Sequence, residues 1–333
     1  MEWPFNLIFP LLAFFFSMFG TRYLIGYLTS HDILDRPNIR SSHVQPTPRG
    51  GGIAVMSSLL LIWLVVGIVE GAEGVEVITI VGISMILAGT SLLDDLKGLS
   101  ASLRFAVHLF AVSTALYFVP FPGLIFGGIL SSEWDLIVTA VLWVWFINLF
   151  NFMDGIDGLA SVEAIAISIG IFVIVRKLGF DEKSMILSLS IGAALLGFLR
   201  WNWHPAKIFL GDVGSIPLGF VLGWMLLGLA ANGAWAPALI LPLYFLIDAT
   251  WTLFQRIISR EKLWEAHCQH FYQRAVASGL KHDQVSWIVT VANLFLIMLS
   301  IIAARGLPEA AVLAAFGAVG VLMFLLVKGG PTN

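Results

Sequence analysis

The sequence is 333 residues long, with 59% hydrophobic residues, only 12% charged residues and a formal net charge of −3. Soluble domains carry about 25% charged residues, so this composition predicts an integral membrane protein and leaves no water-soluble domain of useful size. The charge gives no reason to expect a nucleic-acid partner. The single cysteine, Cys268, excludes an internal disulfide framework and a multi-cysteine metal site.

Eleven segments of the chain are long and apolar enough to span a bilayer, which takes about 20 mostly apolar residues. They predict an all-α, polytopic membrane helix bundle that forms a single domain over residues 1–333. Several segments are short or interrupted by glycine, so ten spans are the alternative. The predicted spans are 4–28, 52–70, 75–93, 104–120, 134–150, 159–176, 184–199, 214–231, 235–254, 285–304 and 308–327.

Eleven spans put the two chain ends on opposite sides of the membrane. With the N-terminus outside, fourteen of the 18 lysines and arginines lie on the inner side, which is a strong positive-inside asymmetry. This orientation also places on the cytoplasmic side five aspartates that adjoin apolar segments. A carboxylate near hydrocarbon is costly unless it faces water, a partner or a cation, so we expect one shared polar site. The predicted cytoplasmic segments are 29–51, 94–103, 151–158, 200–213, 255–284 and the C-terminal tail.

The first cytoplasmic segment ends in PTPRGGG, residues 46–52. Proline cannot continue a helix, and a run of glycines allows another backbone to approach closely. The candidate phosphate ligands in this segment are Arg36, Arg40 and Arg49, together with His43. The alternative is a basic loop that only obeys the positive-inside rule.

The next motif is the pair Asp94 and Asp95 at the end of an apolar segment. Neighbouring residues on a helix point about 100° apart, so the two carboxylates cannot share one contact equally. We expect one of them to face the polar site and the other to meet Lys97 or the helix end. The alternative is a solvated helix terminus.

A stripe of oxygen-bearing side chains follows at a spacing of three residues, formed by Asn148, Asn151, Asp154 and Asp157. This spacing predicts that they lie on one side of a helical or near-helical turn. Oxygen ligands without thiolates suit a hard cation such as Mg²⁺, with Mn²⁺ as the alternative. The competing interpretation is a polar capping turn.

Asp212 lies in FLGDVGS, residues 209–215, at the predicted start of a helix. An aspartate there is an ordinary N-cap. Beside the oxygen-bearing stripe, Asp212 is also a plausible second metal ligand from another helix, because Mg²⁺ sites use one or two carboxylates and leave positions for water and phosphate.

The last motif is HCQHFYQR, residues 267–274. His267 and His270 are three residues apart, so they share a face if the stretch is helical. Two histidines are too few for a structural zinc site, and the nearby Arg274 favours phosphate binding. The alternative, compatible with that role, is an interfacial amphipathic helix.

Hard-cation ligands and basic loops at a bilayer boundary suit a phosphorylated substrate that meets a lipid, because a metal neutralises diphosphate charge during phosphoryl transfer. A transporter or lipid flippase is the leading alternative, and it predicts acidic residues at mid-membrane and two symmetric halves. A non-catalytic scaffold does not account for the Asn/Asp stripe.

Taken in order, five segments resemble the motifs of the polyprenyl-phosphate N-acetylhexosamine-1-phosphate transferase family. This family includes the phospho-MurNAc-pentapeptide transferase of peptidoglycan synthesis and the enzymes that start O-antigen synthesis. The matching segments are PTPRGGG at 46–52, DDLKGLS at 94–100, NLFNFMDGIDGLA at 148–160, FLGDVGS at 209–215 and HCQHFYQR at 267–274.

The resemblance implies a multi-pass enzyme of the bacterial inner membrane, with its active site on the cytoplasmic face. Its reaction transfers an N-acetylhexosamine-1-phosphate from a UDP-sugar to undecaprenyl phosphate and releases UMP. The implied catalytic residues are Asp94 and Asp95 near the acceptor phosphate, one of them a candidate base, and Asp154 and Asp157 on the nucleotide side. The resemblance also implies Mg²⁺ contacts for Asn151 and Asp212. It implies substrate binding for Arg49, Asn148, His267, His270 and Arg274.

The histidine segment departs from the peptidoglycan enzyme, whose corresponding segment has adjacent histidines. The pattern HxxHxYQR resembles the O-antigen-initiating branch, which implies a UDP-GlcNAc, UDP-FucNAc or UDP-QuiNAc donor and the start of a lipid-linked envelope polysaccharide. The phospho-MurNAc-pentapeptide transferase remains the alternative within the family. Besides its substrates, the enzyme is expected to contact membrane lipid, and a homodimer is left open.

Overall fold

The structure is a computed structural model that describes residues 7–37, 45–262 and 267–328. Parts of two predicted cytoplasmic segments, 38–44 and 263–266, and the tail 329–333 lie outside the described residues. The described chain contains ten helices long and apolar enough to cross a membrane, which confirms the all-α, multi-pass prediction. They are α2 (Ile8–Ser30), α3 (Gly52–Val69), α4 (Val75–Lys97), α5 (Ala101–Phe118), α6 (Ser132–Phe152), α7 (Leu159–Leu178), α8 (Glu182–Asn202), α9 (Asp212–Ala231), α13 (His282–Ala303) and α14 (Pro308–Lys328).

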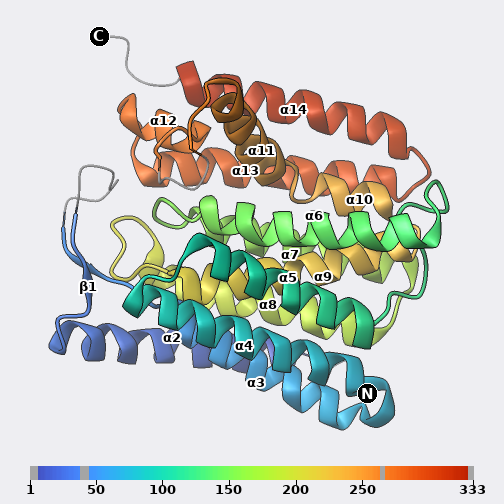
Figure 1. The fold of residues 1–333 in the computed structure, drawn as a ribbon, viewed down its shortest axis with the longest axis horizontal. Helices are drawn as coiled ribbons and strands as arrows, with labels where there is room; N and C mark the ends of the chain where they lie inside the picture. The colour runs from blue at the N-terminus through green and yellow to red at the C-terminus, as the bar shows by residue number, and fades with distance from the viewer. Residues whose placement is uncertain (1–6, 38–44, 263–266, 329–333) are drawn as a thin grey trace.

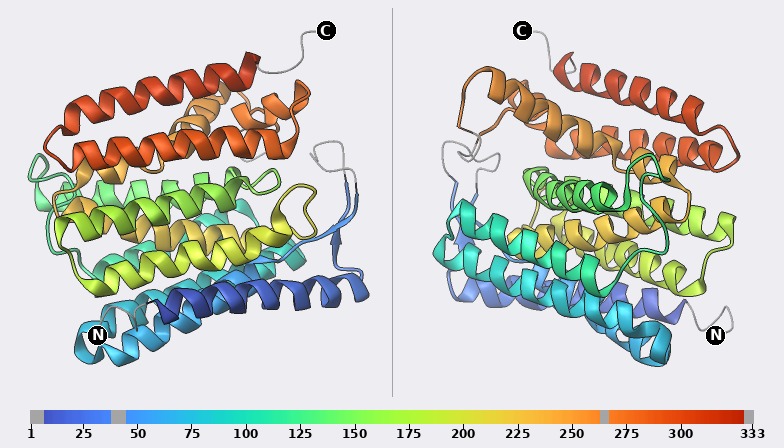
Figure 2. Two further views of the ribbon diagram at one scale, coloured as in Figure 1. Left: turned by 180° about the vertical axis from the view of Figure 1, so that it is seen from behind. Right: turned by 45° about the vertical axis from the view of Figure 1, so that its right-hand side comes forward.

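The helices run roughly parallel to the long axis of the molecule, with α2 and α14 at opposite edges and α6 to α9 between them (Figures 1 and 2). The short connections that carry the aspartate motifs gather at one end of the bundle, on the left in Figure 1. We call this the aspartate end. It contains the strands β1 (Leu34–Asp35) and β2 (Thr47–Pro48), the turn 153–158, the loop 203–211 and the helix α12 (Phe271–Ala277).

The predicted span 235–254 is not one continuous helix. It is divided into α10 (Trp235–Ile240) and α11 (Leu243–Ile258), which together return the chain toward the aspartate end. Pro242 lies between the two helices and has no backbone N–H to continue the first one. The sequence pattern missed this break because both halves are apolar.

A buried acid joins two helices of the bundle. Glu163 of α7 is fully buried, and Asn293 Nδ2 of α13 donates a hydrogen bond to its Oε2 at 2.7 Å. An acidic side chain inside a membrane bundle is costly without a partner. This contact therefore links α7 to α13.

An aromatic contact holds α6 against α9. Trp143 and Phe220 stack with ring centroids 4.9 Å apart, and Trp143 Nε1 donates a hydrogen bond to the Phe220 carbonyl at 3.0 Å. Both side chains are fully buried. This contact fixes the two helices side by side, and both helices have their motif residues at the aspartate end.

The starts of α3 and α9 approach more closely than side chains would permit. A Cβ atom on Gly52 would lie 2.3 Å from the Cα of Gly214. We expect Gly52→Ala to lower the free energy of unfolding by about 1–3 kcal/mol, because the clash is with backbone and cannot relax by side-chain rotation. Unfolding of the detergent-solubilised protein measures the effect.

Gly82→Ala is the matched control for this substitution. Gly82 is an exposed residue of α4 with no atom within 4 Å of its added Cβ. Alanine favours a helix by up to about 1 kcal/mol over glycine, so we expect no loss of stability. Equal stability of the two variants would contradict the close approach of α3 and α9.

Candidate active site

Two of the sequence motifs pair through their backbones at the aspartate end. Phe209 N donates to the Pro48 carbonyl at 2.8 Å, and the N–H groups of Gly51 and Gly52 donate to the carbonyls of Phe209 and Leu210, each at 2.8 Å. PTPRGGG thus lies along FLGDVGS. The pairing places the side chain of Arg49 directly beside the first turn of α9.

Arg49 is the centre of a polar cluster that joins four segments of the chain. Its Nη2 lies 2.7 Å from Asp212 Oδ1 and 3.0 Å from Asp95 Oδ1. Asn151 Nδ2 donates to Asp212 Oδ1 at 3.1 Å and to Ser215 Oγ at 2.8 Å. We call Arg49, Asp95, Asn151 and Asp212 the Arg49 cluster. It brings together predicted residues from the PTPRGGG segment and from α4, α6 and α9.

Gly211 is required where the cluster is tightest. Its φ is +76°, a backbone conformation that L side chains rarely adopt, and an added Cβ would lie 3.3 Å from both Arg49 Cγ and Asp95 Oδ2. Gly211 is also the N-cap of α9, and α9 has no side-chain cap. Asp212 therefore lies in the first turn and contacts Arg49 and Asn151, which argues against the interpretation of Asp212 as an N-cap.

Asp154 lies near this cluster and experiences its charges. Burial raises the pKa of Asp154 to about 7, Arg49 opposes the increase, and the neighbouring carboxylates add to it. For Arg49, burial favours the neutral form, but the carboxylates of Asp212 and Asp95 outweigh it and raise the pKa of the guanidinium. The local excess of carboxylates thus favours any cation placed there.

The cluster fits a hard divalent cation. Asp95 Oδ1 is buried and receives no hydrogen bond, although the Arg49 guanidinium is close enough for an ion pair. A buried carboxylate oxygen that accepts no hydrogen bond, beside a second carboxylate and an amide, offers the oxygen ligands that Mg²⁺ prefers. Arg49 contacts Asp95 and Asp212, the two acids whose charge such a cation would neutralise.

The neighbouring aspartates Asp94 and Asp95 have separate surroundings. Asp94 Oδ1 accepts from the backbone N–H of Leu99 at 2.6 Å, and Asp94 Oδ2 pairs with Arg104 at 3.2 Å. Asp94 thus fixes the turn between α4 and α5, whereas Asp95 belongs to the Arg49 cluster.

The oxygen-bearing stripe does not stay together. The helix α6 ends at Phe152, so Asp154 and Asp157 lie on the turn that follows it. Asn148 donates from Nδ2 to the Val144 carbonyl of its own helix at 2.7 Å. Of the four residues in the stripe, Asn151 donates a hydrogen bond within the Arg49 cluster and Asp154 lies close enough to experience its charges. Asn148 and Asp157 contact other partners.

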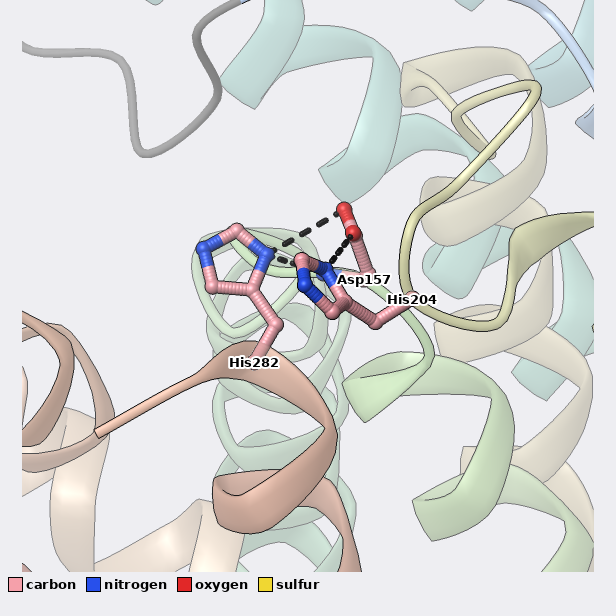
Figure 3. A group of neighbouring side chains, drawn as sticks. All are labelled: Asp157, His204 and His282. Carbon is pink, nitrogen blue, oxygen red and sulfur yellow. Dashed lines mark hydrogen bonds and ion pairs between the residues drawn. The ribbon is translucent and has the colours of Figure 1, made fainter.

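Asp157 is held by two histidines that the sequence reasoning missed (Figure 3). Its Oδ2 lies 2.6 Å from His204 Nδ1, and its Oδ1 lies 3.3 Å from His282 Nδ1. Burial alone would raise the pKa of Asp157, but hydrogen bonds from His282 and His204 hold it below its ordinary value. The two histidines are 47 and 125 residues away in sequence, so spacing gave no signal.

The histidine motif is also arranged differently from the prediction. The helix α12 begins at Phe271, so His267 and His270 do not share a helical face. His270 is buried, with Nδ1 3.1 Å from Asp248 Oδ1, and Tyr244 donates to the other oxygen of Asp248 at 3.1 Å. Asp248 is a further residue that sequence reasoning missed, because it lies in an apolar segment without a motif.

His267 and Arg274 are more accessible than His270. Burial lowers the pKa of His267 to about 4, helped by His270 and Arg256, so the imidazole is neutral at pH 7. Arg274 is exposed, lies over the Phe271 ring, and borders a groove of about 620 Å³ beside α11. These two residues remain predicted substrate contacts, whereas His270 holds the segment in place.

Tyr272 connects the histidine motif to the aspartate turn. Its hydroxyl donates to the Phe152 carbonyl at 3.0 Å, and a Cβ added to Gly155 would lie 2.0 Å from the same oxygen. The motifs at 148–160 and 267–274 are therefore packed against each other.

The bundle and this site define a class of protein, a multi-pass membrane enzyme with carboxylates and an arginine gathered at one end of its helices. A sequence profile of glycosyl transferase family 4 matches residues 77–230. The chain belongs to this family and is a phosphoglycosyltransferase. This membership confirms the resemblance inferred from the five motifs.

Named relatives agree with this assignment. A protein of Bacillus subtilis named probable undecaprenyl-phosphate N-acetylglucosaminyl 1-phosphate transferase is 33% identical over 265 residues, covering 75% of this chain and 71% of the relative. A decaprenyl-phosphate N-acetylglucosaminephosphotransferase of Mycolicibacterium smegmatis is 35% identical, with 56% and 51% covered. A phospho-N-acetylmuramoyl-pentapeptide-transferase of Shouchella clausii is 31% identical, with 53% and 58% covered. The chain thus spans about half the length of the mycobacterial relative.

Proposed function

We propose that this enzyme transfers N-acetylglucosamine-1-phosphate, or a close N-acetylhexosamine-1-phosphate, from a UDP-sugar to undecaprenyl phosphate at the cytoplasmic face of a bacterial inner membrane. The observation that carries the proposal is the Arg49 cluster, a set of carboxylates with one guanidinium at the end of an apolar bundle. A lipid phosphate and a water-soluble diphosphate can both reach such a place. The names of the relatives support the same pair of substrates.

In this reaction, a phosphate oxygen of the lipid attacks the β-phosphorus of the UDP-sugar, which carries the sugar. A new P–O–P bond forms, and the bond between the β-phosphorus and the oxygen that bridges to UMP breaks. UMP leaves with this bridging oxygen. A phosphate monoester has a second pKa of about 6 and is largely ionised near neutral pH, so Asp95 is not needed as a strong base. The task of the protein is mainly to position the two phosphates.

Arg49 is suited to hold a phosphate oxygen, because its guanidinium lies between Asp95 and Asp212 at the centre of the cluster. Asp95, Asp212 and the amide of Asn151 would hold Mg²⁺, with Mn²⁺ as the alternative. A bound divalent cation would neutralise the charge of the diphosphate. The nucleotide-side role of Asp154 and Asp157 remains a prediction.

For the donor, we propose UDP-GlcNAc ahead of UDP-FucNAc and UDP-QuiNAc, with the product starting a lipid-linked envelope polysaccharide such as O-antigen. The HxxHxYQR pattern and the GlcNAc-transferring relatives support this choice. UDP-MurNAc-pentapeptide is the second candidate, because relatives named for that reaction also match.

A donor competition tests the proposal. Purified protein in detergent is given undecaprenyl phosphate, Mg²⁺ and equal concentrations of UDP-GlcNAc and UDP-MurNAc-pentapeptide, and UMP and the lipid products are measured. We expect GlcNAc-diphospho-lipid as the main product. Preference for the pentapeptide donor would overturn the donor assignment, and absence of UMP release with every UDP-sugar would overturn the reaction itself.

The two motif histidines should respond differently to substitution. We expect His267→Gln to raise the KM for the UDP-sugar about tenfold, the effect of one lost hydrogen bond of about 1.4 kcal/mol, without loss of stability. We expect His270→Gln to lower the free energy of unfolding, because it disrupts the buried contact with Asp248. Steady-state kinetics and thermal unfolding, measured on both variants, separate the two effects. A selective increase in the KM for the lipid in His267→Gln would contradict the donor-side role.

A further inference from the structure

A groove of about 500 Å³ lies on the face of the bundle that α2, α8, α7 and α13 form in this order (Figure 2, left). The helices α7 and α8 pack against each other and line its middle, while α2 packs on α8 and α13 packs on α7. The lining is apolar except for Arg200 and Thr290, and the Thr290 hydroxyl donates to the Ser286 carbonyl of its own helix at 2.7 Å. Arg200 is thus the only charged side chain in the described lining of the groove.

The groove begins between two tryptophans at the aspartate end of the bundle. Trp203, directly after α8, and Trp287, in the second turn of α13, contact each other edge to face with ring centroids 5.5 Å apart. From Trp287 the lining extends along α13 to Ile297, which is roughly 15 Å farther into the bundle at the rise of a helix. Tryptophan is enriched at the level of the lipid headgroups, so the groove reaches from this level into the hydrocarbon.

Arg200 brings an unpaired positive charge to this end of the groove. Its side chain is exposed, and its Cζ lies 5.5 Å from the centroid of the Trp201 ring. Lys207 Nζ lies 5.4 Å from the same ring, and Trp201 Nε1 donates to the Met18 carbonyl of α2 at 3.0 Å. Among the described residues, no carboxylate forms an ion pair with either cation. Basic pockets between spanning helices bind anionic lipid headgroups, and this pair of cations has the matching charge.

We propose that this surface, which we call the α2–α13 groove, binds one anionic phospholipid of the bilayer, with an acyl chain along α7 and α8 and the headgroup phosphate against Arg200. A zwitterionic headgroup carries its own cation, which Arg200 and Lys207 would repel. The lipid acceptor of the proposed reaction fits less well, because its phosphate is needed at the Arg49 cluster and no residue of that cluster lines the groove. Apart from this last comparison, the proposal is independent of the transfer reaction.

A bound phospholipid would hold neighbouring segments together at the aspartate end. It would cover Leu196 of α8 and Leu294 of α13, which are 48% and 58% exposed. It would also pack on Trp203, at the start of the loop 203–211 that leads to Asp212. A ligand that binds only the folded state stabilises it by mass action, so we expect the lipid to raise the unfolding temperature.

Lipid competition, measured by native mass spectrometry, tests the proposal. The delipidated full chain in detergent is given equal concentrations of phosphatidylglycerol and phosphatidylcholine with identical acyl chains, and the lipids retained on the intact protein are counted. We expect one retained phosphatidylglycerol per chain, preferred over phosphatidylcholine by at least about tenfold, the effect of one charge-assisted contact. Equal retention of the two lipids would overturn the proposal.

Arg200→Gln should abolish this preference. We expect the variant to retain phosphatidylglycerol about tenfold more weakly and phosphatidylcholine as before. Arg22→Gln is the matched control, because Arg22 is an exposed arginine on the half of α2 nearer the aspartate end and does not line the groove. We expect the control to retain phosphatidylglycerol as the unmodified protein does. No loss in Arg200→Gln, or an equal loss in both variants, would contradict a headgroup site at Arg200.

Ala166→Phe tests the part of the groove assigned to the acyl chain. Ala166 of α7 lines the groove, and an added ring would fill it, so we expect weaker retention of both lipids by a folded variant. Unchanged retention would place the lipid elsewhere and sink the proposal. If neither variant folds, the preference of the unmodified protein for phosphatidylglycerol still decides the question.

The same spectra distinguish the other possible occupants. Displacement of phosphatidylglycerol by an equal concentration of undecaprenyl phosphate would assign the groove to the acceptor. A dimer that retains no lipid would show that a second copy of the chain covers it. Either result would overturn the proposal, whereas a failed transfer assay would leave it untouched, because the readout is lipid binding.

Discussion

Replacement of Asp212 by asparagine should reduce transfer by at least about 100-fold while the protein remains folded. Asp212 contacts both Arg49 and Asn151, so its charge organises the Arg49 cluster. A metal ligand or counter-charge of this kind supplies several kcal/mol to phosphoryl transfer, and each 1.36 kcal/mol is about a factor of ten in rate. UMP release at saturating and at limiting Mg²⁺ measures the loss.

Asp181→Asn is the matched control for that experiment. Asp181 also lies at a helix start, but it is a true N-cap that accepts a hydrogen bond from Ser184 N at 2.6 Å. Asparagine caps helices about as well as aspartate, so we expect little change in stability or rate. If Asp212→Asn behaves like Asp181→Asn at limiting Mg²⁺, Asp212 has only a helix-terminal role.

The adjacent variants Asp94→Asn and Asp95→Asn should fail in different ways. We expect Asp95→Asn to lower the rate about 100-fold with little loss of stability, because Asp95 faces Arg49 and has an oxygen available for a cation. We expect Asp94→Asn to lower the free energy of unfolding by about 1.5–3 kcal/mol, because it weakens the hydrogen bond that closes the α4–α5 turn.

The Arg104 partner of Asp94 is 39% exposed, so little of the stability loss is expected to come from that ion pair. Arg104→Gln should therefore be milder than Asp94→Asn. Rates and unfolding midpoints measured on all three variants separate the effects. Equal losses of activity in Asp94→Asn and Asp95→Asn at equal stability would contradict the separation of the two aspartates.

The sequence was sufficient for the bundle and for the central part of the site. Apolar length identifies spanning helices because a bilayer requires it, and ten of the predicted spans correspond to long helices among the described residues. The four residues of the Arg49 cluster were predictable from their positions at the ends of apolar runs. Carboxylates, an amide and a guanidinium are costly there unless they share a polar site.

The remaining parts depend on contacts that have no sequence period. Asp248 holds His270 from 22 residues away, and Asn293 donates to the buried Glu163 from 130 residues away. The spacing of three could not show where the stripe ends as a helix, because α6 ends at Phe152, before Asp154 and Asp157. The glycines at 155 and 158 instead let the chain turn after α6, and Gly158 adopts a φ of +78°.

The composition of the Arg49 cluster has a consequence for electroneutrality. Four carboxylates, those of Asp212, Asp95, Asp35 and Asp154, act on the single guanidinium of Arg49, so acids outnumber the guanidinium even where the buried Asp154, whose pKa burial raises to about 7, is partly protonated. A divalent ion would reduce this excess of negative charge. A bare diphosphate would meet net repulsion there, whereas a diphosphate already chelated by the ion would not. We therefore expect the ion and the UDP-sugar to enter the site together, as a neutral chelate of the ion with the diphosphate.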